Sequence, residues 1–177
     1  LSPVNKTTPR GRGRGRAKRK PSKAEVKTQT LHSLLYKIGH YLHVVEQKRD
    51  FQVFEITELI EDADWGDISV EAAQDAWTEL QNDPRGLFMC VEVDPEGDGD
   101  PEKDIYRSTH LTFQEFFGAK QCVQDARAAE SIDGWIEETF GSTPNPWLRE
   151  VLLMTTEMLS GEEFLQVARF FLEADDG

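Results

Sequence analysis

The sequence predicts a mainly α-helical protein with a small β-hairpin, arranged as a winged-helix domain followed by antiparallel helical hairpins. Two observations lead to this fold class. Three segments with apolar residues at helical spacing precede two segments of alternating residues, which is the order of a winged helix. Four further helical segments then follow, joined by short loops that favour antiparallel neighbours. We expect a basic tail over residues 1–27, the winged helix over 28–110 and the helical domain over 111–177.

The first expected helix covers residues 29–48. Its apolar stripe consists of Leu31, Leu34, Leu35, Ile38, Leu42 and Val45. Residues 51–54 are expected to be extended, and residues 55–60 to form a brief second helix.

His40 and His43 of the first expected helix lie three residues apart and could bind a metal together, but no Cys or carboxylate completes a ligand set on that helix. We therefore expect no metal site, and both histidines at the surface.

The third expected helix begins after Ser69, a favourable N-cap residue. In a DNA-reading winged helix this element enters the major groove and needs Lys or Arg. From Val70 to Asp83 the sequence has no Lys or Arg and several carboxylates, so repulsion by phosphates argues against that role. Leu87, Met89, Val91 and Val93 alternate as the first wing strand, and residues 105–109 provide the returning strand.

The loop between these two strands, Asp94–Asp104, resembles part of a calcium-binding EF-hand loop. Carboxylates or glycine stand at positions 1, 3, 5, 6 and 9, but position 12, which needs a bidentate Glu, is Ile105. The flanking segments are strands and not helices. We interpret the loop as an exposed acidic hairpin loop, with weak, incidental cation binding as the alternative.

After the wing, Thr112 and Glu115 have the spacing of a helix capping box. Phe113, Phe116 and Phe117 follow at helical spacing, so we expect the first turn of this helix to enter a core. His110 then lies just outside the helix start, where free amides and the positive end of the helix dipole favour an anion. A purely structural role for His110, in packing or capping, is the alternative.

Three later helices complete the chain. One contains Trp135 and Phe140, the next is expected to start at Asn145 and Pro146, and Ser160 with Glu163 gives a capping box for the last. A helical array that stops at the last helix leaves an apolar face uncovered. We therefore expect a protein partner on the helical domain.

The stretch from Tyr106 to Ala119 resembles the end of the winged helix in NACHT-type STAND NTPases, the family that includes the NOD-like receptors. The matching residues are Tyr106, His110, Thr112, Phe113, Gln114, Glu115 and Phe116. The resemblance implies that His110 contacts the β-phosphate of ADP in the complete protein and holds the resting state. It also implies that the later helices begin a second helical domain. The basic tail departs from the pattern, because the family has a helical domain there.

The chain itself has no GxxxxGK[ST] loop and no catalytic nucleophile motif, so we expect no enzyme activity and no cofactor bound by this chain alone. The resemblance makes it a fragment without the P-loop core, with ADP or ATP held by an NTPase core in cis or in trans. The predicted function is the nucleotide-sensing regulatory part of a signalling NTPase. The predicted location is cytoplasmic, because no signal peptide or membrane span is visible and the two cysteines suggest no disulfide scaffold.

The tail carries ten Lys or Arg and one Glu, against ten Lys or Arg and thirty-two Asp or Glu in the rest of the chain. Its nucleic-acid candidates are Arg10, Arg12, Arg14, Arg16, Lys18, Arg19 and Lys20. Such a segment has too few apolar residues to fold. It could be a solvated tail, a weak AT-hook-like or RNA-binding segment, a nuclear-localisation signal, or a tether to the acidic body. The alternative function is thus a nuclear, chromatin-associated module that binds nucleic acid with its tail and a protein with its helices.

Overall fold

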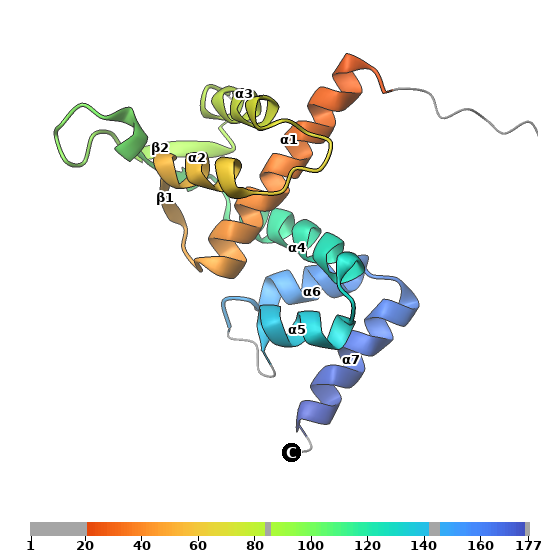
Figure 1. Ribbon diagram of the computed structural model, residues 1–177. Helices are drawn as coiled ribbons and strands as arrows, with labels where there is room; N and C mark the ends of the chain where they lie inside the picture. The colour runs from red at the N-terminus through yellow and green to blue at the C-terminus, as the bar shows by residue number, and fades with distance from the viewer. Residues whose placement is uncertain (1–20, 84–85, 142–145, 176–177) are drawn as a thin grey trace, which may run out of the picture.

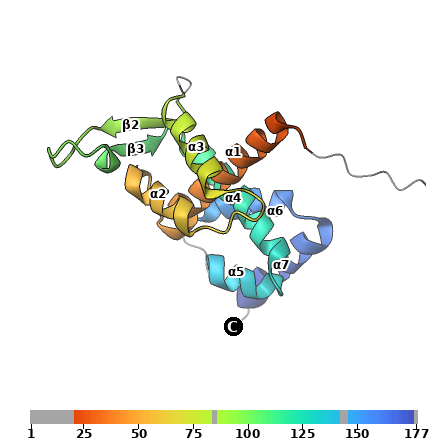
Figure 2. The same cartoon turned by 45° about the horizontal axis from the view of Figure 1, so that its top comes forward.

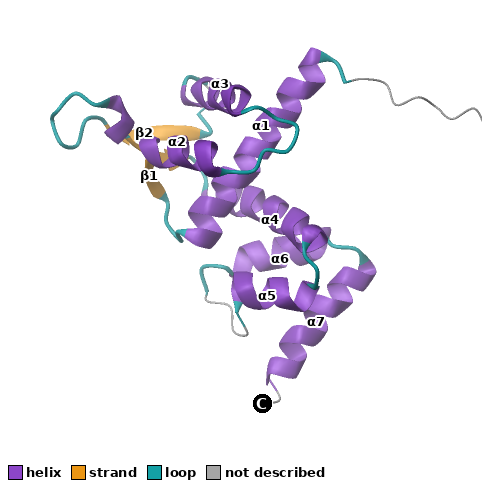
Figure 3. Cartoon of the chain, in the orientation of Figure 1, coloured by secondary structure: helices purple, strands orange, loops and turns teal. Residues whose placement is uncertain are grey.

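The computed structural model describes residues 21–83, 86–141 and 146–175, which form seven α-helices and one three-stranded sheet (Figures 1 and 3). The mainly helical class with a small β element is therefore confirmed. All seven basic tail candidates lie outside the described residues, as does Asn145.

Helix α1, Lys23–His40, begins earlier than expected. Ser22 and Glu25 form a capping box: the backbone N–H of Ser22 donates to Glu25 at 2.5 Å, and that of Glu25 donates to the Ser22 hydroxyl at 3.3 Å. Five residues that we expected in the tail, 23–27, are therefore helical. The helix continues as a single π-helical turn, η1, Tyr41–Val45.

The winged-helix half has one more strand than the hairpin we expected. Its elements after η1 are β1 Asp50–Gln52, α2 Val53–Asp62, α3 Val70–Gln81, β2 Phe88–Glu92, the 3₁₀ turn η2 Pro101–Lys103, and β3 Ile105–Ser108. The sheet is antiparallel with the order β1-β3-β2, so β3 lies in the middle. This order of helices and strands is that of a winged helix. Ser69 caps α3 as expected, accepting from the Ala72 N–H at 3.2 Å.

The first core lies between this sheet and α1, α2 and α3. Phe51 is 2 % exposed and packs edge-on against Phe88, with ring centroids 5.6 Å apart, while Trp77 packs edge-on against Phe88 and Tyr106. The alternation in β2 predicted the strand but not its buried face: Phe88 is buried, whereas Met89, Val91 and Val93 are exposed. Cys90 and Glu92, which alternate with Phe88, are exposed as well, so Phe88 is the one residue of β2 that is buried in the core.

The helical half comprises α4 Leu111–Ala128, α5 Ile132–Phe140, α6 Arg149–Met158 and α7 Gly161–Asp175. Helix α6 packs against α4, and α7 packs mainly against α5, so alternate helices contact more extensively than the sequential neighbours we expected. Helix α6 starts at Arg149, three residues after the expected proline, because residues 146–148 form a turn. The second core contains Cys122, Trp135, Ile136, Phe140, Val151 and Val167.

The apolar side chains of α7 are only partly buried. Val167 is 2 % exposed, but Phe164, Leu165 and Leu172 are all 46 % exposed or more. This helix therefore presents apolar side chains to solvent.

The two halves are joined where α1 crosses α4 (Figures 1 and 2). Gly39 and Gly118 meet at the crossing, and a Cβ added to Gly39 would lie 2.7 Å from the backbone nitrogen of Gly118. Only glycine allows the two backbones to approach so closely.

Candidate functional site

His110 lies at the N-terminus of α4, in the short connection that follows β3. It is the N-cap residue, with extended backbone (φ −130°, ψ 129°), and no side chain caps the first turn. The side chain is exposed, and its ring packs edge-on against Phe113 with centroids 5.4 Å apart. A helix mouth without a side-chain cap offers its first amides to an anion, and an exposed imidazole beside it can donate a further hydrogen bond.

The capping box that we expected at Thr112 and Glu115 is wrong. The helix begins at Leu111, so Thr112 is already the second helical residue and its exposed side chain caps nothing in the described residues. The Ser108 hydroxyl instead donates to the backbone carbonyl of His110 at 3.1 Å, which fixes the corner between strand and helix.

The phenylalanines of α4 do not enter a core as expected. Phe113 and Phe116 are 41 % and 38 % exposed, and only Phe117 is half-buried, against the first core. The rings form a row on the surface between α1 and α4: centroid distances are 6.4 Å from Phe113 to Phe117 and 6.3 Å from Phe117 to Tyr36. The candidate site is therefore an exposed histidine at the end of an exposed aromatic row.

Gln114 has a structural position that the sequence did not reveal. It is 2 % exposed, and its amide donates to the backbone carbonyl of Lys48 at 2.7 Å, tying α4 to the segment between η1 and β1.

Glu115 lies near Glu150 of α6. Partial burial, and then repulsion by Glu150, raise the pKa of the Glu115 carboxyl. Tyr106 is half-buried in the first aromatic core, and burial raises the pKa of its phenol.

The histidines of α1 and η1 do not form the metal pair that their spacing allows. His43 is 1 % exposed, so our expectation of a surface position is wrong for it. Its Nε2 bonds the carbonyl of Trp147 at 2.9 Å, the Trp147 indole donates to the carbonyl of His43 at 2.8 Å, and the two rings stack at 4.7 Å. Because Nε2 faces a carbonyl, it carries the proton, and Nδ1 is left buried without a partner. Burial lowers the pKa of His43.

His40 is half-buried and faces Asp125 of α4, with Nε2 and Oδ2 3.8 Å apart. Burial lowers the pKa of His40 more than Asp125 raises it. No group of three or more metal-ligating His, Cys, Asp or Glu side chains occurs within the described ranges.

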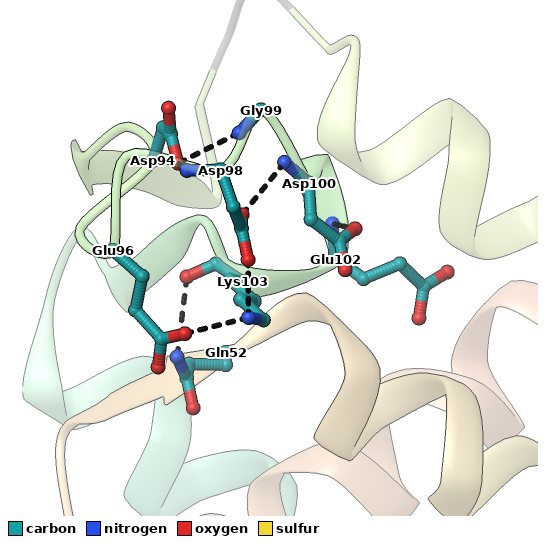
Figure 4. A network of polar contacts seen from close by, with 8 residues as sticks. All are labelled: Gln52, Asp94, Glu96, Asp98, Gly99, Asp100, Glu102 and Lys103. Carbon is teal, nitrogen blue, oxygen red and sulfur yellow. Dashed lines mark hydrogen bonds and ion pairs between the residues drawn. The ribbon is translucent and has the colours of Figure 1, made fainter.

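The acidic wing loop is closed by a lysine (Figure 4). The ammonium of Lys103 lies 2.6 Å from a carboxylate oxygen of Glu96 and 2.5 Å from one of Asp98. Asp94, which has a positive φ of 47°, accepts from the backbone N–H groups of Asp98 and Gly99 at 2.9 and 3.1 Å. The position between the carboxylates that resembled a calcium site thus holds an internal cation.

The exposed face of α3 is acidic. Glu71, Asp75 and Glu79 recur every four residues and are exposed, and this face would meet the major groove if α3 read DNA.

The two cysteines are unpaired. Cys90 is exposed on β2, while Cys122 is buried in the second core, where burial raises its pKa to about 12.

Comparison with protein-family models, with curated proteins and with solved structures gave no match. Within the described part of the chain, no helix combines the length and the hydropathy needed to cross a bilayer.

Proposed function

We propose that this chain is the regulatory, nucleotide-sensing part of a NACHT-type signalling NTPase, in which His110 donates to the β-phosphate of ADP. The observation that carries the proposal is the exposed imidazole at the mouth of α4, within a stretch that resembles the family motif. A histidine with this placement can reach a diphosphate that a P-loop holds on another domain or subunit.

The surroundings of His110 support docking by such a domain. Phe113 and Phe116 expose apolar surface beside the histidine, and Lys120 lies over the ring of Phe116 at 5.2 Å from its centroid. An exposed apolar patch with a cationic edge suits contact with a protein that carries an anionic ligand. Because the chain lacks a P-loop of its own, the NTPase core supplies nucleotide binding and this chain supplies the sensor.

The chromatin-binding alternative finds no support in the described residues. The helix that would read DNA exposes only carboxylates among its charged groups, and the basic candidates lie outside the described part. We therefore rank it second.

The test compares ADP affinity in a protein that joins this chain to its NTPase core. A hydrogen bond to a charged group contributes roughly 1.5–3 kcal/mol, so His110→Ala should weaken ADP binding by about tenfold or more and raise basal signalling. His32→Ala is the matched control, because His32 is an exposed histidine on α1 that the proposal does not use. Equal ADP affinity of His110→Ala and His32→Ala would refute the sensor role.

A further inference from the structure

The surface formed by α2 and α3 is strongly acidic. Residues 55–83 contain ten Asp or Glu and no Lys or Arg. On α3 the exposed carboxylates of Glu71, Asp75 and Glu79 recur at intervals of four residues and so lie along one side of the helix. Like charges at this spacing destabilise a helix, so cations supplied from elsewhere stabilise α3.

The cations that reach this surface come from the segment before α2. Lys27 of α1 pairs with Glu79 at 2.7 Å, Lys37 lies over the ring of Trp65 at 5.3 Å from its centroid, and Lys48 pairs with Glu55. The Lys27 and Glu79 side chains are 67 % and 56 % exposed, which leaves Glu79 accessible to a second cation. The start of α1 thus already contacts the acidic side of α3.

A groove of about 320 Å³ lies between α1 and α3 at this end of the fold. Its floor is apolar, with Val26, Leu31, Ala72 and Ala76, and its rim carries Asp75 and Glu79 on one side and Lys23 and Lys27 on the other. Val26 is 44 % exposed. An extended segment with basic side chains fits such a groove, because its backbone can lie on the apolar floor while its cations reach the carboxylates.

The first residue of α1, Lys23, lines this groove, and residues 1–20 precede it in the chain. These twenty residues hold eight Lys or Arg and no Asp or Glu. Twenty residues span up to about 70 Å when extended, and the twelve residues of α3 span only about 18 Å. The segment can therefore reach every carboxylate of α3, and its attachment gives an effective concentration in the millimolar range.

We propose that residues 1–20 fold back and bind the groove between α1 and α3, with arginine guanidinium groups on Asp75 and Glu79. This contact holds the basic segment away from nucleic acid and neutralises the acidic helix pair. It competes with binding of the same segment to a polyanion, and added salt weakens it.

The first test detects the contact in the full chain. A nitroxide is attached at Thr8→Cys in a Cys90→Ser background, in which the remaining Cys122 is buried. We expect broadening of the α3 amide resonances but not of the α5 amides at about 0.05 M salt, and recovery near 1 M salt, where the Debye length falls to roughly 3 Å. Broadening that is absent, or equal on α3 and α5, would overturn the proposal.

The second test separates the site from the total charge. Asp75→Asn with Glu79→Gln should abolish the broadening, whereas Glu137→Gln with Glu138→Gln, an equal charge change at exposed positions of α5, should retain it. If the segment is released, the first pair of substitutions should also bind a 20-bp DNA duplex about threefold or more tighter than the second pair. Equal affinities would mean that the segment is already free to bind nucleic acid, and the proposal fails.

Discussion

The crossing of α1 and α4 provides the sharpest test of the fold. In Gly39→Ala, the new Cβ would lie 2.6 Å from the Cβ of Phe117, 2.7 Å from the nitrogen of Gly118 and 2.9 Å from the carbonyl oxygen of Gln114. Carbon atoms pack at about 3.5–4.0 Å, so α4 must retreat by roughly 1 Å. Two of these three atoms belong to the backbone and cannot rotate away.

The expected loss follows from two opposing terms. Overpacking costs about 1–3 kcal/mol, with a backbone clash near the upper end, and replacing glycine by alanine inside a helix regains about 0.5–1 kcal/mol. The free energy of unfolding should therefore fall by about 2 kcal/mol in Gly39→Ala. Gly118→Ala should lose less, because its nearest atom, the carbonyl oxygen of Gly39, would lie at 3.2 Å.

The assay is urea unfolding, followed by circular dichroism and tryptophan fluorescence so that both cores are observed. With a slope of about 1–3 kcal/mol per molar urea, Gly39→Ala should lower the midpoint by roughly 1 M. Gly134→Ala on α5 is the control, because its Cβ would meet nothing nearer than 3.6 Å and stability should hold or rise. A Gly39→Ala midpoint at or above that of the parent would refute the close-crossing argument.

Three further predictions concern buried polar groups. Burial lowers the pKa of His43 below its ordinary 6.5, so the His43 imidazole is protonated more readily in the unfolded chain than in the folded protein. Stability should be full above about pH 6.5 and fall as the pH decreases toward the lowered native pKa; urea midpoints at pH 7.5 and 5.5 should differ less in His43→Gln than in the parent. Gln114→Ala should lower the free energy of unfolding by about 2 kcal/mol in the same assay, because it removes a buried hydrogen bond and leaves the carbonyl of Lys48 without its donor. An unchanged urea midpoint would contradict this. In native protein at pH 8 a thiol reagent should modify Cys90 only, with Cys122 reacting after unfolding; two modified thiols in the folded state would show that the second core opens.

Periodicity predicted the helices well, because an amphipathic stripe and a cap are local properties of a sequence. Ser69 and Ser160 mark their helices as expected, with Ser160 and Glu163 forming the capping box at α7. The false capping box at Thr112 shows the limit of such a signal. The strand before α4 ends at Ser108, and its hydroxyl fixes the corner, so the helix starts before the Thr112 side chain can act as a cap.

Which apolar residues are buried was harder to predict, because burial depends on packing between distant segments. Phe113 and Phe116 have the spacing of a core stripe, but α4 packs against α1 through small residues and leaves these rings outside. The position of His43 depends on Trp147, 104 residues away along the chain, and no local pattern links the two. The exposure of His110 agrees with its expected place at the helix mouth, but its contact with a phosphate stays a prediction.

The single π-helical turn at the end of α1 has a consequence for how this chain can be divided. Leu42 belongs to the first core, whereas Val44, two residues later, belongs to the second. The continuous helix formed by α1 and η1 thus contributes residues to the cores of both halves. A fragment that ends near residue 110 would lack α4 and would expose the side of α1 and η1 that packs against it. The two halves should therefore be kept together in any fusion protein.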